Sequence, residues 1–171
     1  MARQSSLKDF QETLARRLRE ATLAQPDSRL AFEVGSKRYV VKLDHSGEVL
    51  PLPPVTRVPL TRAWFLGLAN VRGNLVSVVD WSAFGGQAPV NRSADCRLVL
   101  LSERLGVRCG LVVAKMLGLK SLQGMERSDA NRTDAEQPWI TGCHRDSEGS
   151  EWWELDLAAL AAAPAFLAAA L

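Results

Sequence analysis

The residues that could carry out catalysis in this sequence are few and scattered. The only histidines are His45 and His144, and neither sits by a nucleophile in a known motif such as Gly-x-Ser-x-Gly. No P-loop and no Gly-x-Gly-x-x-Gly pattern occurs, so the sequence does not indicate a phosphate cradle for a nucleotide. An enzyme is therefore the least favoured class of function, and we expect no catalytic residues and no cofactor.

Two aspartates stand out because each follows an apolar strand and precedes a short apolar turn. Asp80 and Asp156 could be paired carboxylates for acid–base catalysis. The alternative is that each caps a helical turn, because an aspartate at that position accepts hydrogen bonds from free backbone N–H groups. The apolar-x-x-apolar run after each aspartate favours the capping role.

The three cysteines, Cys96, Cys109 and Cys143, do not form a recognisable site. An odd number of cysteines without tight spacing is not typical of a disulfide framework. The absence of such a pattern favours a reducing compartment. Only Cys143 and His144 are near each other, whereas a zinc site needs paired ligands at short spacing, such as Cys-x-x-Cys. We therefore expect buried cysteines that act as small apolar side chains, and no metal site.

Composition and charge are those of an ordinary globular protein. Apolar residues make up 47% of the 171 residues and charged residues 23%, and the formal net charge is +2. A charge this small does not indicate a nucleic-acid footprint. Most aromatic residues lie within apolar runs rather than among Lys and Arg. This pattern favours core or interface packing over a ligand cage built from the five tryptophans.

Neither end of the sequence has the pattern of an export signal or a membrane span. The N-terminal stretch is charged and polar and lacks the apolar region of a secretory signal. The apolar stretch 155–171 is interrupted by Asp156 and Pro164, and it falls short of the about 20 apolar residues that a span needs. We expect a cytoplasmic protein without direct membrane insertion.

Residues 1–27 are predicted to form a separate N-terminal helical segment, with an amphipathic helix over 6–24. Packing of this helix on its own domain is the favoured interpretation, and a partner-binding or membrane-surface helix is the alternative. The prediction depends on apolar side chains that recur at steps of three and four, namely Leu7, Phe10, Leu14, Leu18 and Ala21.

The rest of the chain, residues 28–171, is predicted to be mainly β. Short alternating apolar runs are separated by turn signals rich in glycine, proline and polar residues. These runs predict hairpins over 30–43, 64–79, 97–114 and 139–155, an edge strand within 47–59, a strand over 115–122, a loop over 123–137, and helical turns at 81–84 and 157–160.

The order of these elements suggests a duplication. A turn glycine and a capping aspartate are seven positions apart in both halves, as Gly73–Asp80 and Gly149–Asp156. One half is too small to bury both faces of its sheet, so we expect two packed lobes over about 28–90 and 95–162. Chance similarity is the alternative, because turn glycines and capping aspartates are common.

The segment Phe65–Trp81, FLGLANVRGNLVSVVDW, resembles the signature of the CheW family. Upstream, Ser46–Val49 resembles the acidic-apolar strand of that family. Downstream, Trp139–Gly142 and Leu155–Leu160 resemble its closing region. The resemblance covers residues 28–162, and it is specific because these motifs occur together in the family's order.

The resemblance implies a fold of two SH3-like β-barrel lobes with an apolar groove between them, to which this chain adds the N-terminal helix and short C-terminal helices. It also implies a non-catalytic adaptor that links the cytoplasmic tip of chemoreceptors to a CheA-type histidine kinase. The order of residues resembles the pilus-associated PilI branch more than flagellar CheW, which implies control of type IV pili and twitching motility. The alternative from another class is an OB- or SH3-like nucleic-acid module, or another small β-barrel binding module.

The resemblance also implies a recognition surface. Arg72, in a tight turn, presents a planar fork of donors, and Glu48 is its natural acceptor if its strand neighbours the turn. The pair can position a receptor-binding surface or act as a structural ion pair, and we expect it to be partly exposed. The family's proline and leucine are replaced by Ser77 and Trp81, so the choice of partner need not be identical. The expected partner-binding residues are Glu48, Val49, Asn70, Val71, Arg72 and Gly73.

Overall fold

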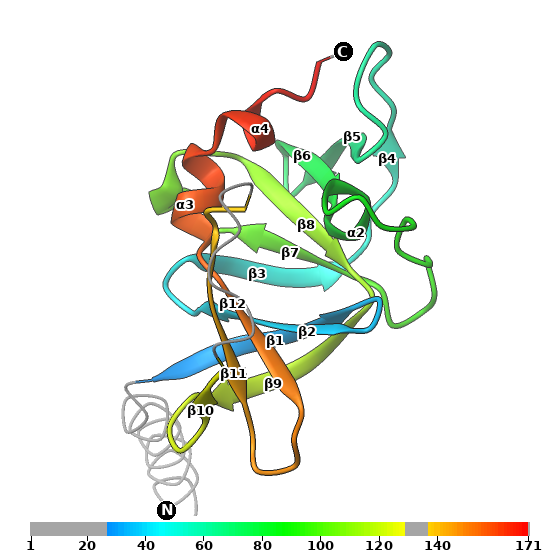
Figure 1. The fold of residues 1–171 in the computed structure, drawn as a ribbon. Helices are drawn as coiled ribbons and strands as arrows, with labels where there is room; N and C mark the ends of the chain where they lie inside the picture. The colour runs from blue at the N-terminus through cyan, green and yellow to red at the C-terminus, as the bar shows by residue number, and fades with distance from the viewer. Residues whose placement is uncertain (1–26, 129–136, 171) are drawn as a thin grey trace, which may run out of the picture.

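A computed structural model describes residues 27–128 and 137–170. The described chain is mainly β, as predicted, and its strands lie in two six-stranded sheets (Figure 1). The predicted N-terminal helix over 6–24 lies outside the described residues, as does 129–136 within the predicted loop. No helix in the part of the chain that the structure describes is long and apolar enough to cross a membrane.

Sheet A contains the first predicted hairpin, formed by β1 and β2. Phe32 lies opposite Tyr39 in this hairpin, and their rings stack with centroids 5.6 Å apart. Such cross-strand aromatic pairs stabilise antiparallel strands. The strands of sheet A lie in the order β10 (Glu126–Arg127), β11 (Ile140–Arg145), β12 (Glu151–Leu155), β2 (Lys37–Lys42), β1 (Ser28–Val34) and β9 (Lys115–Ser121).

Sheet B is built around a strand that is buried along its whole length, β8. Its continuous apolar run has neighbours on both sides, as is typical of a central strand. The order is β3 (Ser46–Pro51), β7 (Arg97–Leu101), β8 (Cys109–Val113), β6 (Asn74–Asp80), β5 (Phe65–Val71) and β4 (Val55–Thr56). The short helices are α2 (Trp81–Phe84), the 3-10 helix η1 (Glu103–Leu105), α3 (Leu157–Ala162) and α4 (Pro164–Leu167).

The sheets do not divide the chain between residues 90 and 95, where the boundary between lobes 28–90 and 95–162 was predicted. The hairpin β1–β2 joins strands of the second half in sheet A, and β7–β8 joins strands of the first half in sheet B. β2 pairs in parallel with β12, and β8 with β6. The first hairpin of each half, β1–β2 or β7–β8, thereby covers an edge strand that the other half would leave unpaired. Within the described residues, the two outermost strands of each sheet do not pair with each other, so neither barrel is closed.

The two halves nevertheless repeat one structure, as the spacing predicted. In both halves a hairpin ends in an aspartate, and the N–H groups of Asp80 and Asp156 each donate to the carbonyl of a tryptophan at the start of that hairpin, at 2.8 Å. The first strand of each hairpin shifts register at a glycine, Gly67 in β5 and Gly142 in β11. Similar local structure at equivalent positions supports a duplication over chance.

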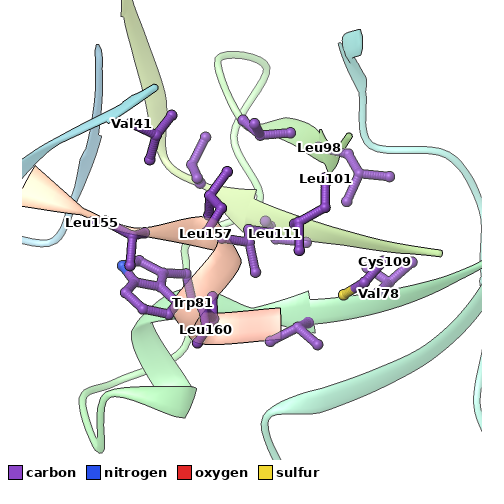
Figure 2. Packing of buried hydrophobic residues seen from close by; sticks show 14 of the residues in the cluster. Val41, Val78, Trp81, Leu98, Leu101, Cys109, Leu111, Leu155, Leu157 and Leu160 are labelled. Atoms are coloured by element: carbon purple, nitrogen blue, oxygen red, sulfur yellow. The ribbon is translucent and has the colours of Figure 1, made fainter. Parts of the chain in front are cut away.

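The main core lies between the two sheets and includes α3 (Figure 2). Leu157 and Leu160 of α3 are 1% and 0% exposed, and Figure 2 shows them beside Trp81 and Leu155. Trp81, Trp139 and Trp152 are all buried, so these tryptophans pack in cores as predicted. A smaller cluster lies against sheet A, made of Ala31, Val40, Leu122 and Trp152.

Candidate functional site

The hairpin turn between β5 and β6 has a conformation that most side chains avoid. Arg72 and Gly73 have φ values of 53° and 86°, and Val71 pairs with Asn74 on either side of them. Positive φ at both central residues is the requirement of a type I′ turn, which favours Asn-Gly. The Asn70 side chain completes the turn, because its Oδ1 accepts a hydrogen bond from the Gly73 N–H at 2.8 Å.

Arginine is an unusual residue for the first central position of such a turn. A side chain other than glycine, asparagine or aspartate adopts positive φ only at a cost of about 1–3 kcal/mol. The turn conformation therefore does not explain why the residue is Arg72. Its side chain is 76% exposed, so burial does not explain it either. The remaining explanation for arginine at this position is its guanidinium group, which the turn holds at the surface.

Arg72 pairs with Glu48, as the resemblance implied. Its Nη2 lies 2.6 Å from Glu48 Oε1, and the Glu48 side chain is 41% exposed. Glu48 belongs to β3, where the register with β7 shifts between Ser46 and Val49. A pair this exposed contributes about 0–1 kcal/mol to stability. The partly exposed pair is the arrangement that we expected, and its small energy argues against a purely structural role.

A pocket of about 150 Å³ lies directly beside this ion pair. Its floor is apolar, and the charged groups Glu48, Arg72, Glu103 and Arg108 contribute to its lining. A pocket of this kind can take an apolar side chain of a partner while charged groups at its rim bind polar groups. The apolar side chains that line it are Val71, Val76, Leu100, Leu101 and Val107.

Five of the six predicted site residues fall into two groups. Glu48, Val71 and Arg72 line the pocket, whereas Asn70 and Gly73 shape the turn. Val49 is partly buried and packs against the main core instead. Sequence reasoning missed the residues that β7, η1 and the segment leading into β8 contribute, such as Leu100 and Val107. The exchange of hairpins between the halves brings them here, and no spacing in the sequence signals it.

Cys109 lines the inner side of the pocket, and burial raises the pKa of its thiol from 9.0 to about 12. Above pH 9 the unfolded chain loses this proton while the folded chain keeps it, so stability falls as pH rises from 9 towards 12. We expect an additional loss of about 1 kcal/mol between pH 8 and pH 10 relative to Cys109→Ala. Urea unfolding of both proteins at the two pH values measures it, and equal losses would contradict the prediction.

The two aspartates are caps, as favoured by the sequence. Asp80 Oδ1 accepts from the N–H of Ala83 at 3.0 Å, and Oδ2 accepts from the N–H of Val90 at 2.9 Å. Asp156 Oδ1 accepts from the first turn of α3, from the N–H groups of Ala158 and Ala159. Backbone donors thus explain both carboxylates without acid–base catalysis.

The histidines each lie beside a carboxylate. His45 Nδ1 is 3.5 Å from Asp156 Oδ1, and His144 Nε2 is 3.3 Å from Glu154 Oε2. Across residues 27–128 and 137–170, no three His, Cys, Asp or Glu side chains gather closely enough to hold a metal ion. The three cysteines are free and buried, as predicted.

Two curated proteins are similar to this chain in sequence. Protein PilI of Pseudomonas aeruginosa is 35% identical over 95 residues, which cover 54% of this chain and 52% of that protein. A probable chemotaxis protein CheW of Rhizobium etli is 30% identical over 93 residues, or 54% of this chain and 59% of the relative. The chain therefore spans little more than half the length of these two relatives.

A solved structure shows the same fold. The scaffolding protein TtCheW from Thermoanaerobacter tengcongensis superposes with a TM-score of 0.63 at 20% identity, covering 76% of this chain and 88% of that one. A model of the CheW-like domain matches residues 29–165, which include both hairpin turns and both capped helices. The chain belongs to the CheW-like domain family.

Proposed function

We propose that this protein is a non-catalytic adaptor that couples the cytoplasmic tip of chemoreceptors to a CheA-type histidine kinase. The observation that carries the proposal is the Glu48–Arg72 pair, held on a strained turn beside an apolar pocket within a CheW-like domain. An adaptor needs preformed surfaces rather than reactive groups. This site offers charge and an apolar pocket, and its lining thiol, Cys109, is buried with a raised pKa, which disfavours the nucleophilic thiolate.

The pathway that we propose is the chemosensory control of type IV pili and twitching motility. The support is the 35% identity to Protein PilI over about half of each chain. The protein would act at membrane-associated receptor arrays from the cytoplasm. The assignment is tested by removing the gene that encodes this chain from its own host and measuring both twitching and swimming. A defect in swimming alone would contradict it.

The receptor-facing surface is assigned to Arg72 and its neighbours, and we expect the substitution Arg72→Asn to separate binding from stability. Asparagine suits the type I′ turn, so the melting temperature should stay unchanged or rise, with a gain of at most about 1 kcal/mol. Binding to a receptor-tip fragment should weaken about tenfold, because the guanidinium fork is lost. Binding to the kinase regulatory domain should change little. Titration calorimetry with both fragments measures this.

The matched control for Arg72→Asn is Arg145→Asn on the second hairpin. Arg145 also forms an exposed cross-strand pair, with its Nη2 3.1 Å from Glu151 Oε1 and 51% and 41% of the two side chains exposed. This variant should bind both fragments normally. Normal receptor binding by folded Arg72→Asn would refute the role proposed for Arg72.

A nucleic-acid module is the alternative, and sheet A offers its one supporting observation. The Nζ atoms of Lys37 and Lys120 lie 4.5 and 4.6 Å from the ring centroids of Trp153 and Trp152. Trp152 is only 5% exposed, however, so its ring is not open for a base to stack on. Fluorescence anisotropy with labelled single-stranded DNA at low salt tests the alternative, and tight binding would favour it.

A further inference from the structure

The loop between β4 and β5 holds an apolar side chain in solvent in a strained conformation. Leu60 has a φ of 59° and is 80% exposed, the highest value among the large apolar residues that are exposed. A leucine in the left-handed region is uncommon and costs free energy, and burial does not compensate it here. Strain of this kind persists only where the surrounding structure fixes it, and it points to a use for the exposed side chain.

The residues that fix this loop come from the other end of the domain. The segment 164–170, which we call the strap, contains α4 and runs beside the loop in Figure 1. The Arg62 N–H donates to the Ala169 carbonyl at 2.8 Å, and Arg62 Nε donates to the Ala168 carbonyl at 3.0 Å. Thr61 and Ala170 form a β-bridge. The strap therefore sets where the loop lies.

The strap is itself anchored in the aromatic part of the core. Phe166 is 6% exposed, and its ring lies parallel to Trp64 at 6.4 Å between centroids and edge-on to Phe84 at 5.5 Å. The next residue, Leu167, is 58% exposed. The strap therefore does two things: Phe166 fixes it to the core, and Leu167 adds a second exposed leucine near the loop.

Two hollows connect the loop and the strap into one surface. A hollow of about 520 Å³ is lined by loop residues that include Leu60 and by Phe65, and a second of about 270 Å³ is lined by Phe65 and the strap. Their shared wall at Phe65 makes them adjacent. Exposed leucines at the edges of such hollows are typical of a site that receives apolar side chains from a partner.

The exposed charged residues of the loop are positive, whereas Arg108 of the second hollow also lines the pocket that contains Glu48 and Glu103. Arg57 and Arg62 are exposed in the loop, and Arg108 lines the second hollow. The sequence contains no aspartate or glutamate between Glu48 and Asp80, and none after Asp156. Exposed arginines in a stretch of sequence without carboxylates favour a partner that supplies carboxylates.

We propose that the strap and the β4–β5 loop form a composite interaction surface for an acidic segment of another protein that carries apolar side chains. Leu60 and Leu167 contact the apolar side chains, and Arg57 and Arg62 pair with the carboxylates. The strap acts as the positioning element, because it holds Leu60 in the strained conformation. The proposed contact residues do not line the pocket beside Glu48 and Arg72, although the second hollow shares Val107, Arg108 and Cys109 with that pocket. Variants at Leu60 and Arg57 therefore test this surface separately from Arg72→Asn, which tests the proposed function.

The test uses the full chain and two synthetic amphipathic helical peptides, one with leucines and glutamates and one with lysine at each glutamate position. Fluorescence anisotropy should show binding of the glutamate peptide and little binding of the lysine peptide. Leu60→Ser and Arg57→Glu should each weaken binding about tenfold. Leu119→Ser, which alters a leucine that is 60% exposed on sheet A, is the matched control and should leave binding unchanged.

The role of the strap is tested first at Phe166, which is not one of the proposed contact residues. Phe166→Ala should weaken peptide binding and remove hydrogen-exchange protection of the Arg62 amide, which donates to Ala169. If this variant unfolds, Arg62→Lys keeps the charge but removes the Nε donor to Ala168, and it should still weaken binding. Equal binding of both peptides, normal binding by Leu60→Ser, or self-association through Leu60 instead of peptide binding would each overturn the proposal.

Discussion

Gly67→Ala should destabilise the protein by at least about 3 kcal/mol, because the new methyl group has no space. A Cβ at Gly67 would lie 2.0 Å from the Thr56 carbonyl oxygen and 2.7 Å from its carbon. Both are backbone atoms of β4, so no side-chain rotation relieves the clash. The φ of 131° is also strained for alanine. For a chain of this size the loss corresponds to about 10 °C in melting temperature.

The duplication supplies the control for this substitution. Gly142 occupies the equivalent position in β11, but a Cβ there would meet its nearest neighbour, His144 Nε2, at 3.5 Å. That distance is ordinary contact, so Gly142→Ala should change the melting temperature by no more than about 3 °C. Thermal unfolding followed by circular dichroism compares the two variants. Equal losses would show that the close approach of β4 is not the reason why position 67 requires glycine.

The strands and turns could be predicted because their signals are local. Alternating apolar residues predicted β1 and β2, and glycine-containing turns predicted the hairpins β5–β6 and β11–β12. The spacing between Gly73 and Asp80 identified a unit that recurs in the second half. The boundary between lobes could not be predicted, because parallel pairing of β6 with β8 and of β2 with β12 joins segments far apart in the chain. No periodicity distinguishes a hairpin that stays in its own half from one that is exchanged.

The candidate site was predicted only where a turn motif marked it. The turn pointed to Arg72 and Gly73, and the family resemblance added Glu48. The pocket beside them needs Leu100 and Val107, which are ordinary core-like residues in the sequence and become site residues only through the topology. Leu60 was missed for a different reason. Its loop is bonded to the strap at the far end of the sequence, and neither its residue type nor its neighbours signal a left-handed conformation.

Asp80→Ala should cost about 3 kcal/mol, the second largest effect that we expect. The side chain is buried, with 2% of the residue exposed, and each of its oxygens accepts one backbone N–H. Loss of the cap on α2 contributes about 1 kcal/mol. The N–H of Val90 loses its acceptor as well, and leaving a buried donor unpaired costs about 1–3 kcal/mol. The loop 85–95 is then no longer fixed to the end of β6.

Two further variants separate these contributions. Asp80→Ser keeps a capping oxygen for Ala83 but cannot reach Val90, so it should recover about 1 kcal/mol relative to Asp80→Ala. Asp156→Ala removes the cap on α3 and the carboxylate beside His45, from a side chain that is 29% exposed, so it should cost about 1 kcal/mol. Urea unfolding gives the three values, and hydrogen exchange at Val90 reports on the loop. If Asp80→Ala and Asp156→Ala were equally destabilising, Asp80 would be a helix cap like its counterpart, and its bond to Val90 would contribute nothing to stability.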